Sequence, residues 1–412
     1  MGYTLIQGAR LVDGTGRAPV ADGAVLVEGE RIAFVGPRAE ALARYPQPDR
    51  VVDAGGLTLL PGLIDAHVHL AGSWVDPERR RLDDEPEYLA AWTAGAAQEV
   101  LRVGITTIGD CGARNGITLP VRDAIAQGHI AGPRIFACGP SITTTAGHGD
   151  YIGIGHEANN ADELRAAVRF WVRRGIDFVK IMATGGSADP ATMRRRAQYS
   201  ADELRAGVAD AHRLGKRVVV HVNGTEGIRN SVEAGADVLA HCNWLGLEEG
   251  TIEFDEEVVR RMADYGAMVD LNAGGVLRPL VPAEGRVLKW HGTSEPRHRW
   301  DLVLRMKELG VRAYLTSDAC GPKIATYPEQ VCQFCEQGDV APLEVIRMAT
   351  QLPAQGLGLD QSIGTLEPGK LADVVAVEGD PSRDIRALTR VKLVVCSGRV
   401  VVSDGLLAGA RA

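Results

Sequence analysis

Six residues with metal-binding or acid–base side chains stand at or near the ends of short apolar stretches: His67, His69, Lys180, His221, His241 and Asp318. Imidazole and carboxylate groups are the ligands that Zn²⁺ and neighbouring divalent ions prefer. His67 and His69 are two positions apart, and on a strand this spacing puts both rings on one face. Each residue alone could be an ordinary polar or ion-paired residue. Together they predict a metal centre.

The elements that must position these residues follow from the alternation of short apolar stretches with amphipathic helical patterns, which is typical of a parallel sheet. Helices are expected at Ala161–Arg174, Ala201–Leu214 and Asp255–Tyr265, and Ser200 with Glu203 has the pattern of a capping box. Eight strands are expected: Thr58–Ile64, Ile105–Gly109, Arg134–Cys138, Phe178–Met182, Val218–His221, Val238–His241, Met268–Leu271 and Ala313–Thr316. This number predicts an α/β fold, a (β/α)₈ barrel whose active site lies at the carboxyl ends of the strands.

The two ends of the chain predict a second, smaller unit. Short strands are expected at Thr4–Ile6, Ala24–Glu28, Arg31–Val35, Ala372–Val377, Val391–Cys396 and Arg399–Val402. Because chain termini often lie close together, residues 1–57 and 365–412 are expected to form one β-sandwich beside a metal-binding barrel of residues 58–364. Residues 273–300 form a long break between strands, which is either a lid over the site or a surface excursion.

Composition excludes several classes of protein. The 412 residues carry a formal net charge of −8, which disfavours general affinity for nucleic acid or anionic membranes. We see no apolar run long enough to span a bilayer and no secretory signal in the first residues. Seven dispersed cysteines suit reduced thiols in the cytoplasm, and the lone pair Cys332 and Cys335 is a weak metal or redox signal. We therefore expect a cytoplasmic enzyme with a small-molecule substrate.

The sequence resembles the amidohydrolase superfamily along essentially its whole length. The residues that carry the resemblance are Gly8–Gly14, Leu60–His69 and Gly364–Asp373. The resemblance implies a homo-oligomeric enzyme with two divalent metal ions, zinc being the first candidate. It also implies that His67, His69 and Asp318 hold one ion, that His221 and His241 hold the other, and that Lys180 bridges both as a carbamate formed with CO₂.

The same resemblance implies a mechanism for amide hydrolysis. A hydroxide shared by the two ions attacks the scissile carbonyl, and Asp318 accepts its proton and passes it to the leaving amine. Asp318→Asn is then expected to keep much of the metal and to lose nearly all turnover.

Within the superfamily, the chain is similar to the Xaa-Pro dipeptidase-like and imidazolonepropionase-like branch. The similar stretches are Phe178–Gly186, the tract around Tyr199, and the turn around His148. His148 is expected to contact the scissile carbonyl or a substrate carboxylate, or else to make a local hydrogen bond. The branch often has His-x-His-Gly where this chain has Asn223 before Gly224, which argues against a prolidase-type substrate.

Three further residues are candidate substrate contacts: Tyr199, Asn223 and Arg194. Arg194 begins a run of three arginines, and a guanidinium group suits a carboxylate. A solvated charge run is the alternative interpretation of that segment.

Four functional interpretations follow. The first is hydrolysis of a dipeptide, an N-acyl amino acid or a related amide, and the second is opening of a cyclic amide, imidazolone or lactone. Deamination of a heterocycle ranks behind them, because deaminases of the superfamily place a glutamate where this chain has Gly224, and Glu226 has the wrong spacing. A non-enzymatic scaffold ranks last, because such proteins usually lack several of the six ligands.

Overall fold

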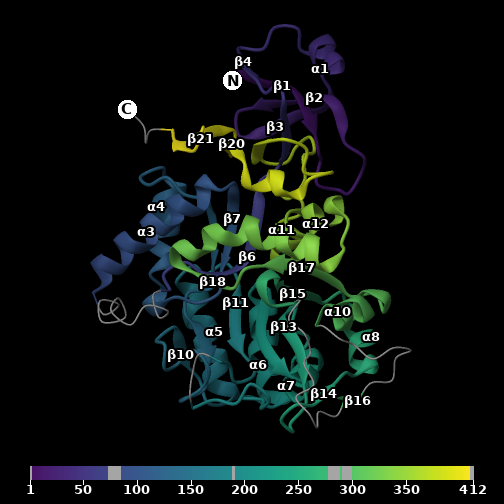
Figure 1. The fold of residues 1–412 in the computed structure, drawn as a ribbon. Helices are drawn as coiled ribbons and strands as arrows, with labels where there is room; N and C mark the ends of the chain where they lie inside the picture. The colour runs from purple at the N-terminus through teal and green to yellow at the C-terminus, as the bar shows by residue number, and fades with distance from the viewer. Residues whose placement is uncertain (1, 73–84, 188–190, 277–287, 290–298, 409–412) are drawn as a thin grey trace.

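The computed structural model describes residues 2–72, 85–187, 191–276, 288–289 and 299–408. In these residues an α/β unit occupies the middle of the chain, and a sheet built from both chain ends lies at one end of it (Figure 1). The predicted alternation of parallel strands and helices is confirmed. No described helix combines the length and apolar character needed to cross a membrane.

The terminal sheet joins the two ends of the chain in one hydrogen-bonded set of strands, in the order β22-β21-β20-β19-β5-β1-β2-β3 with β4 beside β1. Leu5 and Ile6 lie on opposite faces of β1, as neighbours on a strand must, and each belongs to a separate apolar cluster. The strands are β1 (Tyr3–Leu11), β2 (Val20–Glu28), β3 (Arg31–Pro37), β4 (Arg50–Asp53), β5 (Leu57–Pro61), β19 (Val374–Glu378), β20 (Val391–Cys396), β21 (Arg399–Ser403) and β22 (Leu406–Leu407).

The central strands form two groups, whose strands are parallel except that β14 pairs with β13 in the antiparallel sense. One contains β18-β6-β7-β8, and the other runs from β9 through β11, β12, β13 and β15 to β17, with the short strands β10, β14 and β16 at its margins. The strands are β6 (Leu63–His69), β7 (Ile105–Asp110), β8 (Arg134–Ala137), β9 (Ser141–Thr143), β10 (Gly155–Glu157), β11 (Val179–Met182), β12 (Val218–Gly224), β13 (Val238–Leu245), β14 (Ile252–Glu253), β15 (Met268–Asn272), β16 (Leu288–Lys289), β17 (Arg312–Thr316) and β18 (Ala319–Cys320).

Helices alternate with these strands and bury apolar faces against them. The three expected helices are present, and α6 begins with the predicted capping box of Ser200 and Glu203. The α-helices are α1 (Arg38–Arg44), α3 (Pro86–Arg102), α4 (Thr118–Ala126), α5 (Ala161–Arg173), α6 (Ala201–Arg213), α7 (Thr225–Ala234), α8 (Glu256–Tyr265), α9 (Ala273–Val276), α10 (Arg299–Glu308), α11 (Tyr327–Gly338), α12 (Pro342–Met348) and α13 (Gln351–Leu357).

One expected strand is divided between the two sheets. The stretch Thr58–Ile64 was expected to open the barrel, but Leu57–Pro61 pairs with β19 in the terminal sheet and the central strand begins at Leu63. The break falls at Gly62, where a Cβ would lie 1.9 Å from Oγ1 of Thr106. The chain therefore passes from one sheet to the other at a residue that has no room for a side chain against β7.

The strand register brings the candidate residues to one end of the sheet. On the parallel strands β11, β12 and β13, Met182 lies beside His221 and Val222 lies beside His241. Across the other group, His69 lies beside Cys320, two residues after Asp318. The carboxyl ends of these strands therefore face a common space.

Candidate active site

A cavity of about 420 Å³ lies where the strand ends meet. It collects nine of the ten residues proposed from the sequence, from seven separate segments of the chain. Its described lining is His67, His69, His148, Ile152, Ile154, Lys180, Met182, Ser187, Arg194, His221, Asn223, His241, Asn243, Asn272, Gly275, Arg299, Asp318 and Cys320.

One group of three candidate ligands lies at the β6 side of the cavity. Nε2 of His67 and Nε2 of His69 are each 3.5 Å from Oδ1 of Asp318, and the potential ligand atoms of all three lie within 4.8 Å of one another. Asp318 has a left-handed backbone (φ 52°), and its N–H donates to the carbonyl of His67 over 2.9 Å. The turn after β17 thus directs the carboxylate toward the two rings.

The electrostatics keep Asp318 ionised. Burial alone would raise the pKa of its carboxyl, but the imidazoles of His67 and His69 outweigh that effect and hold the pKa well below its usual range. Its side chain is 29% exposed, and the exposed part faces the cavity. An ionised carboxylate open to the cavity can bind a cation and can exchange protons with a bound molecule.

A second pair of candidate ligands lies on the neighbouring strands β12 and β13. Nδ1 of His221 is 3.0 Å from Nε2 of His241. Two nitrogens at this separation can both bind one ion at about 2.05 Å, with an angle of about 94° at the ion. Burial lowers the pKa of His241 to about 3 and the pKa of His221 well below its usual value, so both rings are neutral and can offer a lone pair.

Lys180 lies between the two groups. Its side chain is 1% exposed, and Nζ is 3.3 Å from Nε2 of His67. Among the described residues, no carboxylate lies within ion-pair distance of this amine. A buried ammonium group without an anionic partner is costly, so the position favours chemistry that removes the positive charge.

Three of the histidines have one ring nitrogen held by the protein and the other facing the cavity. Nδ1 of His67 is 2.9 Å from Asp270, and Nδ1 of His69 is 3.1 Å from the carbonyl of Gly112. Nε2 of His221 is 3.2 Å from the carbonyl of Gly185. Acceptors of this kind fix the tautomer of a metal-binding histidine. The residues present therefore fit the binding of a divalent cation.

Sequence reasoning missed Asp270. Its position inside the apolar stretch Met268–Leu271 requires a buried partner for the acid. The structure buries its side chain to 1% exposure, and the imidazole of His67 offsets the cost of burial and lowers the pKa of its carboxyl. The unexplained buried charge was the signal that could have found it.

Asn243 and Asn272 were also missed. Asn243 donates to Oδ1 of Asn223 over 2.5 Å, and Arg194 contacts the same oxygen at 3.3 Å. Nδ2 of Asn223 in turn lies 2.8 Å from Nε2 of His221. The sequence does contain a signal for them: an asparagine stands two positions after each of His221, His241 and Asp270. This is the spacing of His67 and His69, and on a strand it puts both side chains on the same face.

Tyr199 does not reach the cavity, and its assignment as a substrate contact is corrected. Its side chain is 2% exposed and belongs to the main apolar core, and its hydroxyl donates to the carbonyl of Ala158 over 2.7 Å. It directly precedes Ser200, the N-cap of α6, so it anchors the start of that helix.

His148 lines the cavity. Its ring centroid is 4.4 Å from that of His221, and its backbone N–H donates to Gln198 over 2.6 Å. Cys332 and Cys335 lie elsewhere, in α11, where their thiols donate to the carbonyls of Ile385 and Val340. Of the segment considered as a lid, residues 277–287 and 290–298 lie outside the described residues.

Comparisons with known proteins bear on the family of this chain. Residues 58–401 match the model of the amidohydrolase family. The chain belongs to the amidohydrolase family. Members of this family generally bind metal, and His67, His69 and Asp318 form a group that could hold such an ion. Residues 23–47 also match an imidazolonepropionase-like composite domain of bacteria.

Three relatives show the branch within the amidohydrolase family. The chain is 28% identical to an ochratoxinase of Aspergillus niger over 95% of its own length and 84% of the relative, and the solved ochratoxinase structure superposes with a TM-score of 0.79. A solved Xaa-Pro dipeptidase with bound methionine is 27% identical, with a TM-score of 0.78 over 97% of this chain and 99% of that one. An imidazolonepropionase of Geobacillus kaustophilus is 26% identical over 94% of this chain and 91% of the relative. This amidohydrolase is therefore an enzyme that hydrolyses C–N bonds of the amide kind.

Proposed function

We propose that this amidohydrolase cleaves the amide bond of a small molecule that carries a carboxylate, such as an N-acyl amino acid or a dipeptide, with two divalent metal ions. Zinc is the first candidate, because imidazole and carboxylate ligands suit it. His67, His69 and Asp318 would hold one ion, and His221 and His241 the other. The 3.0 Å separation of the facing nitrogens of His221 and His241 supports the second site.

The observation that carries the proposal is the position of Lys180. Its amine is buried beside His67, and among the described residues no carboxylate lies within ion-pair distance of it, which is a poor site for a cation. Reaction of the neutral amine with CO₂ forms a new N–C bond and releases one proton, and the product is an anionic carbamate. Its oxygens would make Lys180 a ligand shared by both ions.

When bound, the ions would lower the pKa of water and polarise the scissile carbonyl. Asp318 would accept the proton of the attacking water, because its carboxylate is ionised and faces the cavity. It would then deliver that proton to the leaving nitrogen. Hydrolysis breaks the C–N bond, adds hydroxyl to the carbonyl carbon and returns hydrogen to the nitrogen, so the products are a carboxylic acid and an amine.

The cavity wall suggests how the substrate lies. Ile152, Ile154 and Met182 form an apolar cluster on the side of His148. Arg194 and Arg299 line the cavity as well and carry the guanidinium groups that suit a carboxylate. We infer that the apolar part of the substrate packs on the isoleucines and that its carboxylate meets the arginines.

A cyclic amide, imidazolone or lactone is the second candidate, supported by the similarity to imidazolonepropionase. The chain is also 26% identical to a 5-methylthioadenosine/S-adenosylhomocysteine deaminase of Symbiobacterium thermophilum, but the residues of the site argue against deamination. At Gly224, where such a deaminase would need a glutamate, a Cβ would lie 2.3 Å from the carbonyl oxygen of Arg195. The backbone leaves no room for that side chain.

We also infer that the two parallel groups of strands close into a (β/α)₈ barrel. The chain passes directly from β8 in one group to β9 in the other, and β18, which follows β17, pairs with β6. The N–H of Asp318 also donates to His67 on β6. Residues 62–364 would form this barrel, and the two chain ends, which include β5, would form a small β-sandwich. Assembly into a homo-oligomer and a cytoplasmic location stay predictions.

The test is a screen of the zinc-loaded protein against N-acyl amino acids, dipeptides, lactams and lactones. Two equivalents of metal per chain and hydrolysis of an open-chain amide are expected. Addition of ¹³C-bicarbonate should give a carbamate NMR signal that the Lys180→Met variant lacks. A metal-loaded protein that hydrolyses none of these amides, or a wild-type sample without the carbamate signal, contradicts the proposal.

A further inference from the structure

A second, smaller cavity adjoins the metal cavity on the side of α10. It measures about 30 Å³, two to three times the roughly 10–15 Å³ that a cavity needs to hold one water molecule. The two cavities have five lining residues in common: His241, Asn243, Asn272, Gly275 and Arg299. The small cavity is therefore a side pocket of the active site.

The part of this side pocket farthest from the metal ligands is apolar. Leu302 and Val303 project from α10, and Leu271 and Cys242 complete the wall from β15 and β13. Leu302 is 1% exposed and Val303 is 3% exposed, so their positions are fixed by the core around them. A pocket with such walls prefers an apolar group and resists expansion.

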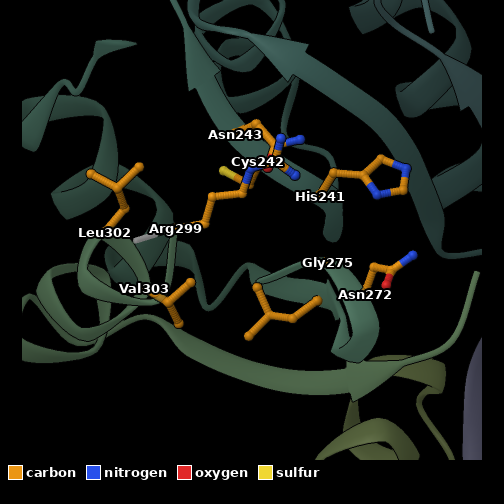
Figure 2. A pocket seen from close by; sticks show the side chains of 9 residues that line it. His241, Cys242, Asn243, Asn272, Gly275, Arg299, Leu302 and Val303 are labelled. Atoms are coloured by element: carbon orange, nitrogen blue, oxygen red, sulfur yellow. The ribbon is translucent and has the colours of Figure 1, made fainter. Parts of the chain in front are cut away.

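The mouth of the side pocket is polar. Figure 2 shows Arg299 reaching toward Cys242 and Asn243, while Leu302 and Val303 lie on the α10 side and the imidazole of His241 points away from them. Guanidinium and amide N–H groups are suitable donors to a carboxylate. An apolar hollow thus lies directly beside donors for an anion.

In an N-acyl amino acid the side chain and the carboxylate are attached to the same carbon, next to the nitrogen that leaves. We propose that the side pocket receives this side chain, and that Leu302 and Val303 restrict it to a small apolar group. The substrate class is then an N-acyl derivative of a small apolar amino acid such as alanine. This inference rests on the proposed function.

The experiment measures kcat/KM of the zinc-loaded enzyme for N-acyl derivatives of glycine, alanine and leucine with one acyl group throughout. The wild type is expected to prefer alanine to both of the others. Leu302→Ala is expected to raise the leucine-to-alanine ratio at least about tenfold, since one methylene group in a pocket is worth about 10-fold to 200-fold in kcat/KM. Val303→Ile, which adds one carbon to the wall, is expected to lower the alanine-to-glycine ratio.

Ratios between substrates are independent of the fraction of folded enzyme, so a loss of stability in either variant does not affect the result. Leu304→Ala is the matched control, because Leu304 lies on the same helix and is 40% exposed. If both pocket variants hydrolyse the amides normally and show unchanged ratios, the side pocket does not receive the amino-acid side chain, and the proposed function still stands. Failure of the wild type to hydrolyse any N-acyl amino acid overturns the proposed function itself.

Discussion

Removing the carboxylate of Asp270 should weaken metal binding although Asp270 does not line the cavity. Its Oδ2 lies 2.9 Å from Nδ1 of His67, and its side chain is 1% exposed. With Nδ1 protonated and held in this way, Nε2 of His67 is free to bind an ion. Loss of such a supporting carboxylate costs about 10-fold to 100-fold in metal affinity, or about 1.4 to 2.7 kcal/mol.

The two possible substitutions should differ. In Asp270→Ala, the Nδ1–H of His67 is left without its buried acceptor, so the loss should approach 100-fold. In Asp270→Asn, the side-chain oxygen can still accept that hydrogen bond, and the loss should be about tenfold. Competition for zinc with a chromophoric chelator measures both affinities.

Asp210 provides a matched control, since its side chain is 7% exposed and pairs with Arg169 and Arg213 on α5 and α6. Asp210→Asn should lower the free energy of unfolding and leave zinc affinity unchanged. Equal zinc affinity in the wild type and Asp270→Ala would refute the reasoning. So would an equal loss in Asp210→Asn.

Three other predictions concern the proton-transfer residue, the buried histidines and the core. Asp318→Asn should retain at least one metal equivalent and lose at least about 100-fold in kcat, and a variant with wild-type kcat would exclude Asp318 as the proton carrier. In the metal-free protein, burial lowers the pKa of His241 to about 3. Between about pH 6.5 and pH 3 the imidazole is therefore protonated in the unfolded chain but not in the folded one, and the free energy of unfolding falls as the pH falls. Burial raises the pKa of Asp65 to about 7, which changes the stability with pH in the opposite sense, so the His241 effect is isolated by comparing urea unfolding of the wild type with that of His241→Asn. The free energy of unfolding of the variant should depend on pH less steeply, by about 1.4 kcal/mol per pH unit in this range. An equal pH dependence in the two proteins would contradict the prediction. Tyr199→Phe removes the hydrogen bond to Ala158 and should lower the free energy of unfolding by about 1 kcal/mol without changing KM. A raised KM would instead indicate that Tyr199 contacts the substrate.

Much of the site could be predicted because strand ends are visible in the sequence. His221 and His241 each follow an apolar stretch, and parallel strands place such residues at one edge. Lys180 is conspicuous in the sequence because a charged side chain in an apolar strand needs a partner. The same requirement makes its buried position in the structure informative.

Other features depend on contacts that sequence spacing does not encode. The partner of Asp270 comes from β6, about two hundred residues earlier in the chain, so its role required the assembled sheet. Tyr199 belongs to a stretch that resembles relatives, yet packing at the start of α6 directs its hydroxyl into the core. The split of the stretch Thr58–Ile64 depends on the pairing of Leu57–Pro61 with β19, which lies more than three hundred residues later in the chain.

The most direct test of the account is a crystal structure of the zinc-loaded protein with diffraction data collected on both sides of the zinc absorption edge. Two anomalous peaks are expected, one within about 2.2 Å of ligand atoms of His67, His69 and Asp318 and one equally close to His221 and His241. Additional density on Nζ of Lys180 is also expected between the peaks. A single peak, or an unmodified Lys180 distant from both ions, would contradict the account.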